Sequence, residues 1–279
     1  MDADSESLAP GRSLGPYRLE DLLGEGAVGL VFRARRESDG EIVALKILRT
    51  ELSGDESYRR RFAHEARAAQ EVENSHLVPI LDAGEVNGRH FLAVLYVGGP
   101  SLESRIATEG PLPSKDIARV AAHVGTALDA LHGAGLIHRD VKPANILFDE
   151  DGRALLTDFG LAKGPAYTVL TRTGQVVGTL DYLAPELIRG QPATPATDIY
   201  ALGCVVYQCV SGQPPFGGKS LFEVSGAILE EEPPDPCANR RDLPQALGWA
   251  VSQALAKDPE KRPPTGSAYA HMVRLARKA

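Results

Sequence analysis

The sequence predicts an α+β protein that has a small β-rich lobe and a larger helical lobe. Strand-like patterns dominate between Tyr17 and Val97, with one helical stretch among them. The run Gly98-Gly99-Pro100 then breaks the chain, and helical patterns dominate beyond it. Strands that come first and helices that come afterwards are typical of an α+β fold, in which the two kinds of element are segregated.

The β-rich part follows a short lead-in. Residues 1 to about 15 carry Ser, Gly, Pro and acidic residues without periodicity, so we expect a mobile segment there. A turn at Ser38-Asp39-Gly40 joins two of the strand patterns as a hairpin. Apolar residues in strand-like runs predict strands at 17–23, 29–34, 41–48, 77–82 and 90–97.

The helices are predicted from apolar residues that recur every three to four positions. One helix falls within the β-rich part, at residues 55–73. The others are predicted at 114–134, 197–211, 219–230, 244–256 and 265–277. A chain of 279 residues is long enough for two lobes and for a core that needs no disulfides.

Composition excludes several classes of protein. A net charge of -7 argues against a general nucleic-acid binder. No run of eighteen apolar residues occurs, so no membrane segment is predicted, and the acidic N-terminus lacks the layout of a secretion signal. Cys204 and Cys209 lie in an apolar run, where buried and inert thiols are expected. Three cysteines build no disulfide framework, so we expect a reducing, cytoplasmic setting.

A glycine-rich segment, Gly24-Glu25-Gly26-Ala27-Val28-Gly29, lies between the first two predicted strands. Alone the pattern is weak, because a glycine-rich hairpin turn looks much the same. A Rossmann fingerprint is disfavoured, because its glycines lead into a helix, whereas a strand from Leu30 to Ala34 follows here. Glycines between two strands let the backbone approach phosphates that side chains would obstruct.

A lysine stands inside the third predicted strand. Because side chains alternate along a strand, Ala44 and Lys46 lie on one face and would look into the same cleft. A lysine among apolar residues is costly unless it is paired. The alternative is an edge-strand lysine that reaches water.

The predicted helix at 55–73 offers a partner for that lysine. Glu65 shares a helix face with Phe62, Ala69 and Val72. A carboxylate in such an apolar stripe is expected to have a specific partner. We expect it to face Lys46. The alternative is a surface ion pair with Arg61, four residues away.

The densest chemistry lies in mid-chain, in His138-Arg139-Asp140-Val141-Lys142-Pro143-Ala144-Asn145 and in Asp158-Phe159-Gly160. These two segments combine a candidate base, a cation and two oxygen ligands. Phosphoryl transfer needs hard oxygen ligands for magnesium and cations at the developing charge. The residues therefore favour magnesium-dependent phosphoryl transfer.

These segments resemble the catalytic loop and the metal-binding segment of the protein kinase family. The resemblance implies a bilobal, protein kinase-like fold. It also implies that Asp140 orients the substrate hydroxyl and accepts its proton, while Lys142 neutralises charge on the transferring phosphoryl group. Asn145 and Asp158 would hold Mg²⁺, for which Mn²⁺ is an alternative. A lysine two residues after the aspartate is typical of serine/threonine kinases.

The same resemblance implies an ATP site. Lys46 and Glu65 would form the pair that orients the α- and β-phosphates, and Leu95-Tyr96-Val97 would be the hinge. Val94 would guard the back pocket, and Val31, Ala44 and Leu147 would enclose the adenine. The residues expected to bind ATP are Leu23, Gly24, Glu25, Gly26, Ala27, Val28, Gly29, Leu30, Val31, Ala44, Lys46, Leu95, Val97 and Leu147.

Three further residues match structural positions of the family. Ala184-Pro185-Glu186 resembles the end of the activation segment, and Arg262 resembles the distant ion-pair partner of Glu186. Asp198 matches the buried aspartate that braces the backbone of the catalytic loop.

Between Gly160 and Ala184 the chain is rich in threonine. Thr179 matches the threonine that contacts Asp140 and Lys142 in serine/threonine kinases. Thr171 and Thr173 resemble the paired phosphorylation sites of bacterial relatives, and Arg139 would dock the phosphate and order the loop. The alternative is that these threonines are simply solvated.

We therefore expect an active protein serine/threonine kinase of the bacterial, eukaryotic-like group. It would use Mg-ATP, transfer the γ-phosphate to Ser or Thr hydroxyls of protein substrates and phosphorylate its own activation loop. One kinase domain, at about 17–276, would follow a flexible segment at 1–16, with an N-lobe and hinge at 17–97 and a C-lobe at 98–279. A cytoplasmic location, as a short protein or as part of a longer membrane receptor, and a homodimer for trans-autophosphorylation complete the expectation.

Two rival functions share this fold. A pseudokinase would only bind, but such proteins commonly lose the lysine, the base or a metal ligand, and Lys46, Asp140, Asn145 and Asp158 are all present. A small-molecule phosphotransferase is the other rival. Against it, Glu186 with Arg262 and the threonine-rich loop favour a shelf that binds peptides.

Overall fold

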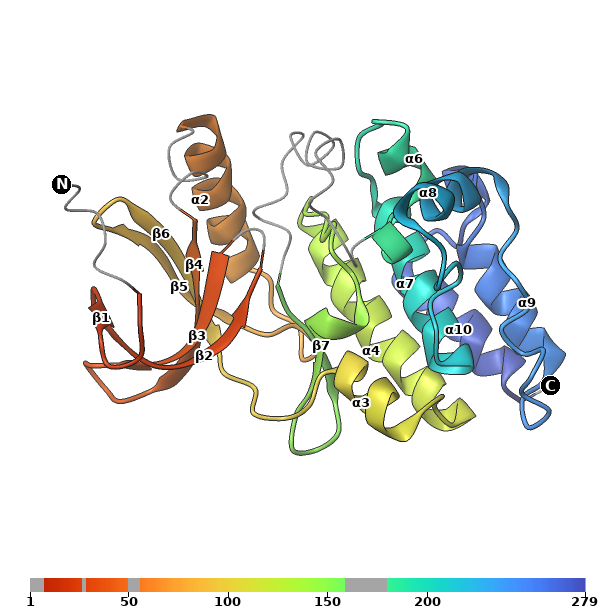
Figure 1. Ribbon diagram of the computed structural model, residues 1–279, viewed down its shortest axis with the longest axis horizontal. Coiled ribbons are helices and arrows are strands. Elements are labelled where there is room, and N and C mark those ends of the chain that lie inside the picture. The colour runs from red at the N-terminus through yellow and green to blue at the C-terminus, as the bar shows by residue number, and fades with distance from the viewer. Residues whose placement is uncertain (1–7, 27–28, 50–55, 159–179, 279) are drawn as a thin grey trace. The chain divides into compact units, whose positions relative to one another are not determined.

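The computed structural model describes residues 8–26, 29–49, 56–158 and 180–278. The chain divides into two compact units. The first comprises residues 1–71 and 78–97, and the second comprises residues 72–77 and 98–279. Figure 1 shows strands and helix α2 (Glu56–Gln70) in the first unit and mainly helices in the second. This is the α+β class that the order of strands and helices predicts.

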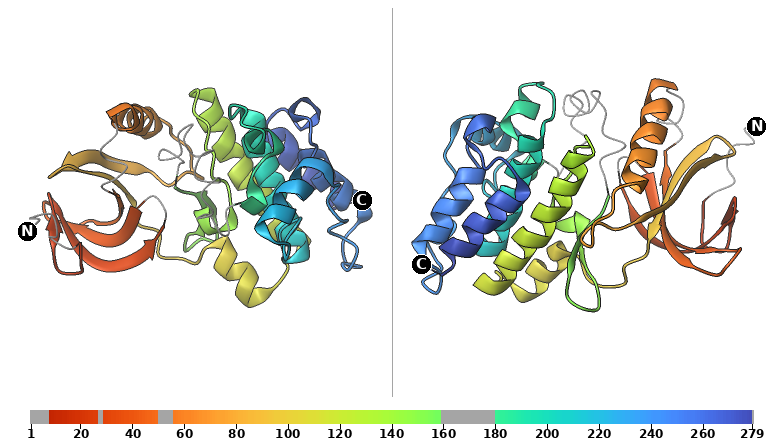
Figure 2. Two further views of the ribbon diagram at one scale, coloured as in Figure 1. Left: turned by 45° about the horizontal axis from the view of Figure 1, so that its top comes forward. Right: turned by 180° about the vertical axis from the view of Figure 1, so that it is seen from behind.

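The first unit is built on one antiparallel sheet in the order β1-β2-β3-β4-β6-β5. The sheet is strongly curved (Figure 2). Within the described ranges, the strands are β1 (Ser13–Leu14), β2 (Tyr17–Glu25), β3 (Gly29–Arg36), β4 (Ile42–Leu48), β5 (Ile80–Val86) and β6 (Arg89–Leu95).

One face of this sheet forms the core of the first unit. Phe32, Leu45 and Ala93 lie opposite one another on β3, β4 and β6, and all three are buried. The neighbouring row, Lys46 with its cross-strand partners, points to the other face because side chains alternate along a strand. Helix α2 (Glu56–Gln70) covers that second face, where Phe62 meets the ring of His90 edge-on at 6.1 Å.

Three details of the first unit differ from the sequence prediction. The lead-in contains strand β1, because the buried Leu14 pairs with Tyr17. Two residues are too few to show a period. Helix α2 ends at Gln70, so Val72 lies beyond it and Ala66 completes the buried stripe. The strand predicted from residue 77 begins at Ile80, and Leu77 belongs to the second unit, where it forms a bridge with Leu156.

The second unit packs helices around a buried central helix. Helix α7 is buried over most of its surface, and α4 packs against both α7 and α10. In the part of this unit that the structure describes, the helices are α3 (Leu102–Glu109), α4 (Ser114–Gly133), α6 (Pro185–Ile188), α7 (Pro195–Ser211), α8 (Leu221–Glu230), α9 (Gln245–Ala254) and α10 (Gly266–Ala276). Short 3₁₀ turns occur at η1 (Pro143–Asn145), η3 (Leu180–Tyr182) and η4 (Pro259–Lys261), and a hairpin at β7 (Ile146–Phe148) and β8 (Ala154–Leu156).

The five long helices predicted for this unit are present with small shifts at their ends. Helix α3 and the β7–β8 hairpin were not predicted, because they are too short to show a clear period. Cys204 and Cys209 are fully buried on α7, as expected, and burial raises the pKa of the Cys209 thiol to about 12. Among the described helices, none combines the length and the apolar character needed to span a bilayer.

Helices α4 and α10 approach each other at two glycines. A Cβ atom on Gly125 would lie 2.6 Å from the carbonyl oxygen of Gly266, closer than real Cβ contacts. Any larger residue at this crossing would force the helices apart. The Asp129 carboxylate, one turn further along α4, accepts hydrogen bonds from the first amides of α10, at Gly266 (2.6 Å) and Ser267 (2.8 Å).

Candidate active site

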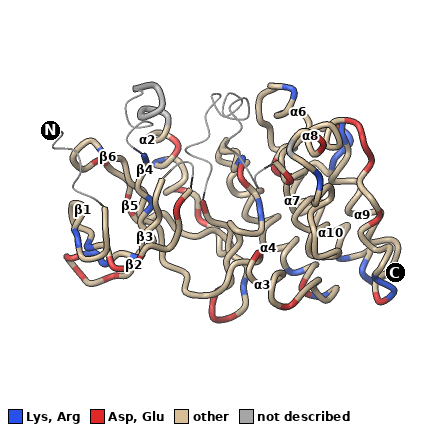
Figure 3. The backbone as a smooth tube through the Cα atoms, in the orientation of Figure 1, with Lys and Arg blue, Asp and Glu red and all other residues tan. Residues whose placement is uncertain are grey.

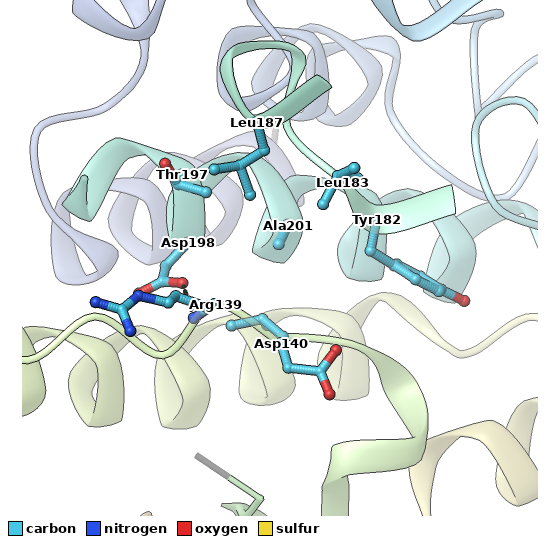
Figure 4. Close-up of a pocket in the computed structure, with 9 residues that line it drawn as sticks. Arg139, Asp140, Tyr182, Leu183, Leu187, Thr197, Asp198 and Ala201 are labelled. Carbon is cyan, nitrogen blue, oxygen red and sulfur yellow. Dashed lines mark hydrogen bonds between the residues drawn. The ribbon is translucent and has the colours of Figure 1, made fainter. Parts of the chain in front are cut away.

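Asp198 on α7 holds the backbone of the loop at 138–145 in place. Its side chain is 1% exposed, and Oδ2 and Oδ1 accept hydrogen bonds from the amides of His138 (2.8 Å) and Arg139 (2.9 Å). Arg139 has φ of 64°, a left-handed conformation that is unfavourable for a residue with a side chain. The two hydrogen bonds that these amides donate to one buried carboxylate stabilise this bend, which Figure 4 shows beside α7.

His132 is a part of this brace that the sequence analysis did not identify. It lies in the last turn of α4, and its Nε2 donates to Asp198 Oδ2 at 2.8 Å. The only signal in the sequence is a histidine near the end of a predicted helix, six residues before His138. That spacing names no partner, because Asp198 is 66 residues away along the chain.

His138 ties the loop to the segment before Asp158. Its ring Nδ1 accepts from the Asp140 amide (3.3 Å), so Nε2 carries the proton and donates to the Thr157 carbonyl (3.1 Å). Burial lowers the pKa of His138, while the carboxylates of Asp198, Asp140 and Asp158 act in the opposite direction. The hydrogen bonds describe a neutral imidazole that joins Asp140 to the Thr157–Asp158 backbone.

The side chains of Asp140, Lys142 and Asn145 meet in one cluster. Lys142 Nζ lies 3.1 Å from Asp140 Oδ2, and Asn145 Nδ2 donates to the same oxygen at 3.0 Å and to the Asp140 carbonyl at 2.8 Å. The turn η1 begins at Pro143 and brings Asn145 back toward Asp140. A carboxylate, an ammonium group and an amide thus converge within hydrogen-bonding distance.

The donor set next to Asp140 fits a hard divalent cation. Since both hydrogen bonds of the Asn145 amide use Nδ2, the side-chain oxygen is the atom left to face a metal. The second expected ligand, Asp158, has φ of 62°, and its carboxylate acts on His138. Within the described residues, no group of three or more His, Cys, Asp and Glu suits a metal. A site made of one amide and one carboxylate depends on oxygen atoms of the substrate for its remaining ligands.

The glycine-rich hairpin belongs to the first unit. Its tip, Ala27 and Val28, lies outside the described residues. A Cβ atom on Gly29 would lie 2.0 Å from the Ile47 carbonyl, so this glycine is required for packing against β4. Among the described residues other than its chain neighbours, no atom lies within 4 Å of the corresponding position at Gly24.

Arg49 supports this hairpin from the end of β4. Its Nη2 pairs with Glu25 at 2.8 Å, and its Nε donates to the Gly26 carbonyl at 3.3 Å. The remaining expected ATP residues of β2 and β3, namely Leu23, Leu30 and Val31, flank the same hairpin.

Lys46 lies on an interior strand of the sheet. Since β4 has β3 on one side and β6 on the other, the alternative of an edge-strand lysine is wrong. Lys46 and Ala44 are half-buried on the face that α2 covers, and Glu65 is half-buried on α2. The pairing of Lys46 with Glu65 stays a prediction, as does the competing pair with Arg61, whose side chain lies outside the described residues.

The expected hinge is the last part of the first unit. Leu95 ends β6, and its amide donates to the Pro79 carbonyl at 3.0 Å. The chain passes from the first unit to the second after Val97. Leu147 lies on β7 of the second unit, whereas Val31 and Ala44 belong to the first. The enclosure of adenine by these three residues therefore stays a prediction.

Glu186 and Arg262 form a buried, bidentate ion pair. Arg262 Nη1 and Nη2 each lie 2.8 Å from a Glu186 oxygen, and the two side chains are 0% and 3% exposed. Thr197 Oγ1 donates to Glu186 Oε1 at 2.9 Å. Burial alone would raise the pKa of Glu186, but the hydrogen bonds and charge of Arg262 outweigh it and hold that pKa below its usual value. The pair fastens α6 to the segment after η4.

A small pocket lies between the loop at 138–145 and helices α6 and α7 (Figure 4). Arg139 and Asp140 line one side, and Leu183, Leu187 and Ala201 form an apolar wall opposite. No pattern in the sequence marks these three apolar residues, which carry no chemical signature. The expected regulatory residues Thr171, Thr173 and Thr179, with Phe159 and Gly160, lie outside the described residues.

Comparisons with known proteins agree with this architecture. The family model described as "Protein kinase domain" matches residues 17–273. Serine/threonine-protein kinase PknE of Mycobacterium bovis is 41% identical over 94% of this chain and 46% of its own length. PknH of Mycobacterium tuberculosis is 39% identical over 93% of this chain and 42% of its own length. The chain thus spans about half the length of these relatives. The crystal structure of the Mycobacterium tuberculosis PknI kinase domain is similar, with a TM-score of 0.78 and 30% identity over 97% of this chain and all of that chain.

Proposed function

Because the chain belongs to the protein kinase domain family, we propose that it is an ATP- and magnesium-dependent protein serine/threonine kinase. The observation that carries this proposal is the cluster of Asp140, Lys142 and Asn145 on a loop held by the buried Asp198. Two curated relatives are serine/threonine kinases by name, and they share about two fifths of the residues.

Each member of the cluster has a proposed task. Asp140 would accept the proton of a substrate Ser or Thr hydroxyl as the oxygen attacks the γ-phosphorus of ATP. Lys142, at 3.1 Å from that carboxylate, would offset the charge that develops on the transferring phosphoryl group. Asn145 and Asp158 would hold Mg²⁺, which neutralises phosphate charge when it is bound.

The protein supplies position more than covalent chemistry. The hydrogen bond from Asn145 Nδ2 orients the Asp140 carboxylate, and His138 ties the Asp140 backbone to the segment of Asp158. Lys46 and Glu65 would orient the α- and β-phosphates in the first unit, below the glycine-rich hairpin. Phosphoryl transfer depends mainly on this positioning and on electrostatic stabilisation.

Replacement of Asp140 tests the proposal most directly. We expect Asp140→Asn to lower kcat for a protein substrate by about a hundredfold to ten-thousandfold, the usual contribution of a positioned base. ATP binding measured by calorimetry should change little. A matched control is Asp151→Asn, because Asp151 is exposed and pairs only with Arg153 among the described residues. Transfer of [γ-³²P]phosphate by Asp140→Asn at the wild-type rate would contradict the assignment.

Metal dependence has its own measurement. We expect EDTA to abolish transfer, and excess Mg²⁺ or Mn²⁺ to restore it, because the ligands proposed here are oxygen atoms. Ca²⁺ should restore it poorly, since it prefers more ligands at longer distances. Activity that persists in EDTA would show that the reaction does not need the Asn145–Asp158 site.

We also propose that the kinase phosphorylates its own loop at Thr171 and Thr173. A phosphate there would meet the Arg139 guanidinium and order the segment next to Asp140. Intact mass after incubation with Mg-ATP, followed by peptide mapping, should find both sites in the wild type and neither in Asp140→Asn. Thr171→Ala with Thr173→Ala should lower the rate on an added substrate. An unchanged rate in this double variant would show that the loop needs no phosphate.

The same assays separate the rival functions. A pseudokinase would bind ATP without transferring phosphate to any acceptor. A small-molecule phosphotransferase would phosphorylate small alcohols or amines but not a generic protein. The proposed protein kinase transfers phosphate to Ser or Thr residues of a protein, and phosphoamino-acid analysis identifies them.

A further inference from the structure

The face of the sheet that bears Lys46 carries a second cation, which the proposed reaction does not use. Arg33 on β3 lies opposite Ala44 of β4, and Ala44 lies opposite Val94 of β6. Opposed residues of antiparallel strands point to the same face. Arg33 therefore belongs to the cross-strand row of Ala44, next to the row of Val31 and Lys46. It borders the region where the adenine of ATP is expected.

The Arg33 guanidinium is held on two sides. Its carbon lies 5.7 Å from the centre of the Tyr96 ring, within the range of a cation–π contact. Its Nη1 donates to Glu20 Oε2 and lies 3.7 Å from Asp21 Oδ2. Figure 3 shows basic and acidic residues side by side in the region of β2 and β3. One side chain thus joins β2, β3 and the expected hinge.

These contacts indicate how Arg33 acts. Its charge is already matched by two carboxylates and by the face of Tyr96, and its side chain is only 30% exposed. A phosphate ligand would have to displace those partners. Tyr96, in contrast, lies between Leu95 and Val97, whose backbones are expected to bind adenine.

We propose that Arg33 is a positioning residue for the base of the nucleotide. By stacking on Tyr96 while bound to Glu20, it fixes the stretch at 95–97 relative to the β2–β3 hairpin and so sets the shape of the adenine site. This inference rests on the proposed ATP-dependent function. It predicts an effect on nucleotide affinity that is independent of the phosphates and that leaves the transfer step nearly unchanged.

The test compares Arg33→Ala with Arg35→Ala. Arg35 also binds Glu20, at 2.8 Å, but it donates its other hydrogen bond to the Gly40 carbonyl instead of stacking on Tyr96. Calorimetry gives Kd for adenosine, ADP and ATP, and steady-state kinetics give KM for ATP and kcat. We expect Arg33→Ala to weaken all three ligands by the same factor, about three- to tenfold, as loss of a partly buried cation–π contact implies.

The kinetic readouts separate positioning from general damage. In Arg33→Ala, KM for ATP should rise with Kd while kcat at saturating ATP stays within about twofold. The reason is that the lost contact stabilises bound ATP equally in the ground state and in the transition state. Arg35→Ala should stay within about twofold of the wild type in both. In a double-mutant cycle with Tyr96→Ala, the double variant should be no weaker than the worse single variant, because both remove one contact.

Other outcomes would overturn the inference. An affinity loss that grows from adenosine to ATP would identify Arg33 as a phosphate ligand. Unchanged affinities, equal losses in Arg35→Ala, or strictly additive effects with Tyr96→Ala would show that the Arg33–Tyr96 contact does not position the base. A wild-type protein that does not bind ATP would overturn the proposed function and this inference together. Wild-type binding with an unaffected Arg33→Ala overturns the inference alone.

Discussion

Breaking the ion pair between Glu186 and Arg262 should destabilise the helical unit more than any exposed ion pair does. In Glu186→Gln the Arg262 guanidinium would stay fully buried with no counter-charge, although it keeps hydrogen bonds to the carbonyls of Ala196, Ala256 and Lys257. Removing one partner of a buried pair costs about 3–5 kcal/mol. We expect a loss of unfolding free energy in that range.

The same contacts give the expected coupling energy between Glu186 and Arg262 in a double-mutant cycle. Arg262→Met leaves Glu186 with only the Thr197 hydroxyl among its side-chain partners in the described chain, so it should cost a similar amount. In the double variant Glu186→Gln with Arg262→Met no charge is left buried. Like Arg262→Met alone, it leaves the carbonyls of Ala196, Ala256 and Lys257 without the Arg262 guanidinium. The double variant should therefore cost about as much as Arg262→Met alone, which corresponds to a coupling energy of about 3 kcal/mol between the two residues.

Urea denaturation followed by circular dichroism at 222 nm is the suitable assay. The only tryptophan, Trp249, is 58% exposed, so its fluorescence reports burial poorly. Asp151→Asn serves as the control, because exposed pairs contribute about 0–1 kcal/mol. A cost below about 1 kcal/mol for Glu186→Gln, or purely additive effects in the cycle, would refute the reasoning from buried charge.

Two further predictions concern packing and pH. Gly125→Ala places a methyl group against the Gly266 backbone and should lower stability by about 1–3 kcal/mol or more in urea denaturation, whereas Gly133→Ala, with open space in the same helix, should be neutral or stabilising. Burial and the stacked ring of His76 lower the pKa of His123 to about 4 from its ordinary value of 6.5. Because the unfolded chain then binds more protons, stability should fall as the pH drops from about 6.5 toward 4, and His123→Gln should flatten this decline in urea titrations at several pH values.

Much of the first unit follows from local pattern. Alternation predicts that Ala44 and Lys46 share a face, and the structure shows that face covered by α2. The position of β4 in the middle of the sheet does not follow from alternation, because an edge strand and an interior strand can have the same pattern. Strand order decided between a lysine on an edge strand and a lysine on an interior strand.

The contacts of the candidate site also fall into those that are local in the sequence and those that join distant residues. Asp140, Lys142 and Asn145 are close in sequence, so a short turn suffices to bring them together. The hydrogen bonds that Asp198 accepts from His138 and His132 join residues some 60 positions apart, and no periodic pattern in the sequence predicts such a contact. Asp198 was expected from family resemblance alone, and His132 was not expected at all.

The sequence by itself determined the fold class and the family resemblance, and it named the residues of the mid-chain motif. These properties depend on residue type, period and short spacing, which the chain carries locally. Only the tertiary structure decided that Leu14 joins the sheet, that Gly125 and Gly266 set the crossing of α4 and α10, and that Arg33 stacks on Tyr96. Such contacts form where distant segments meet, and their energy depends on the burial and geometry of both partners at once.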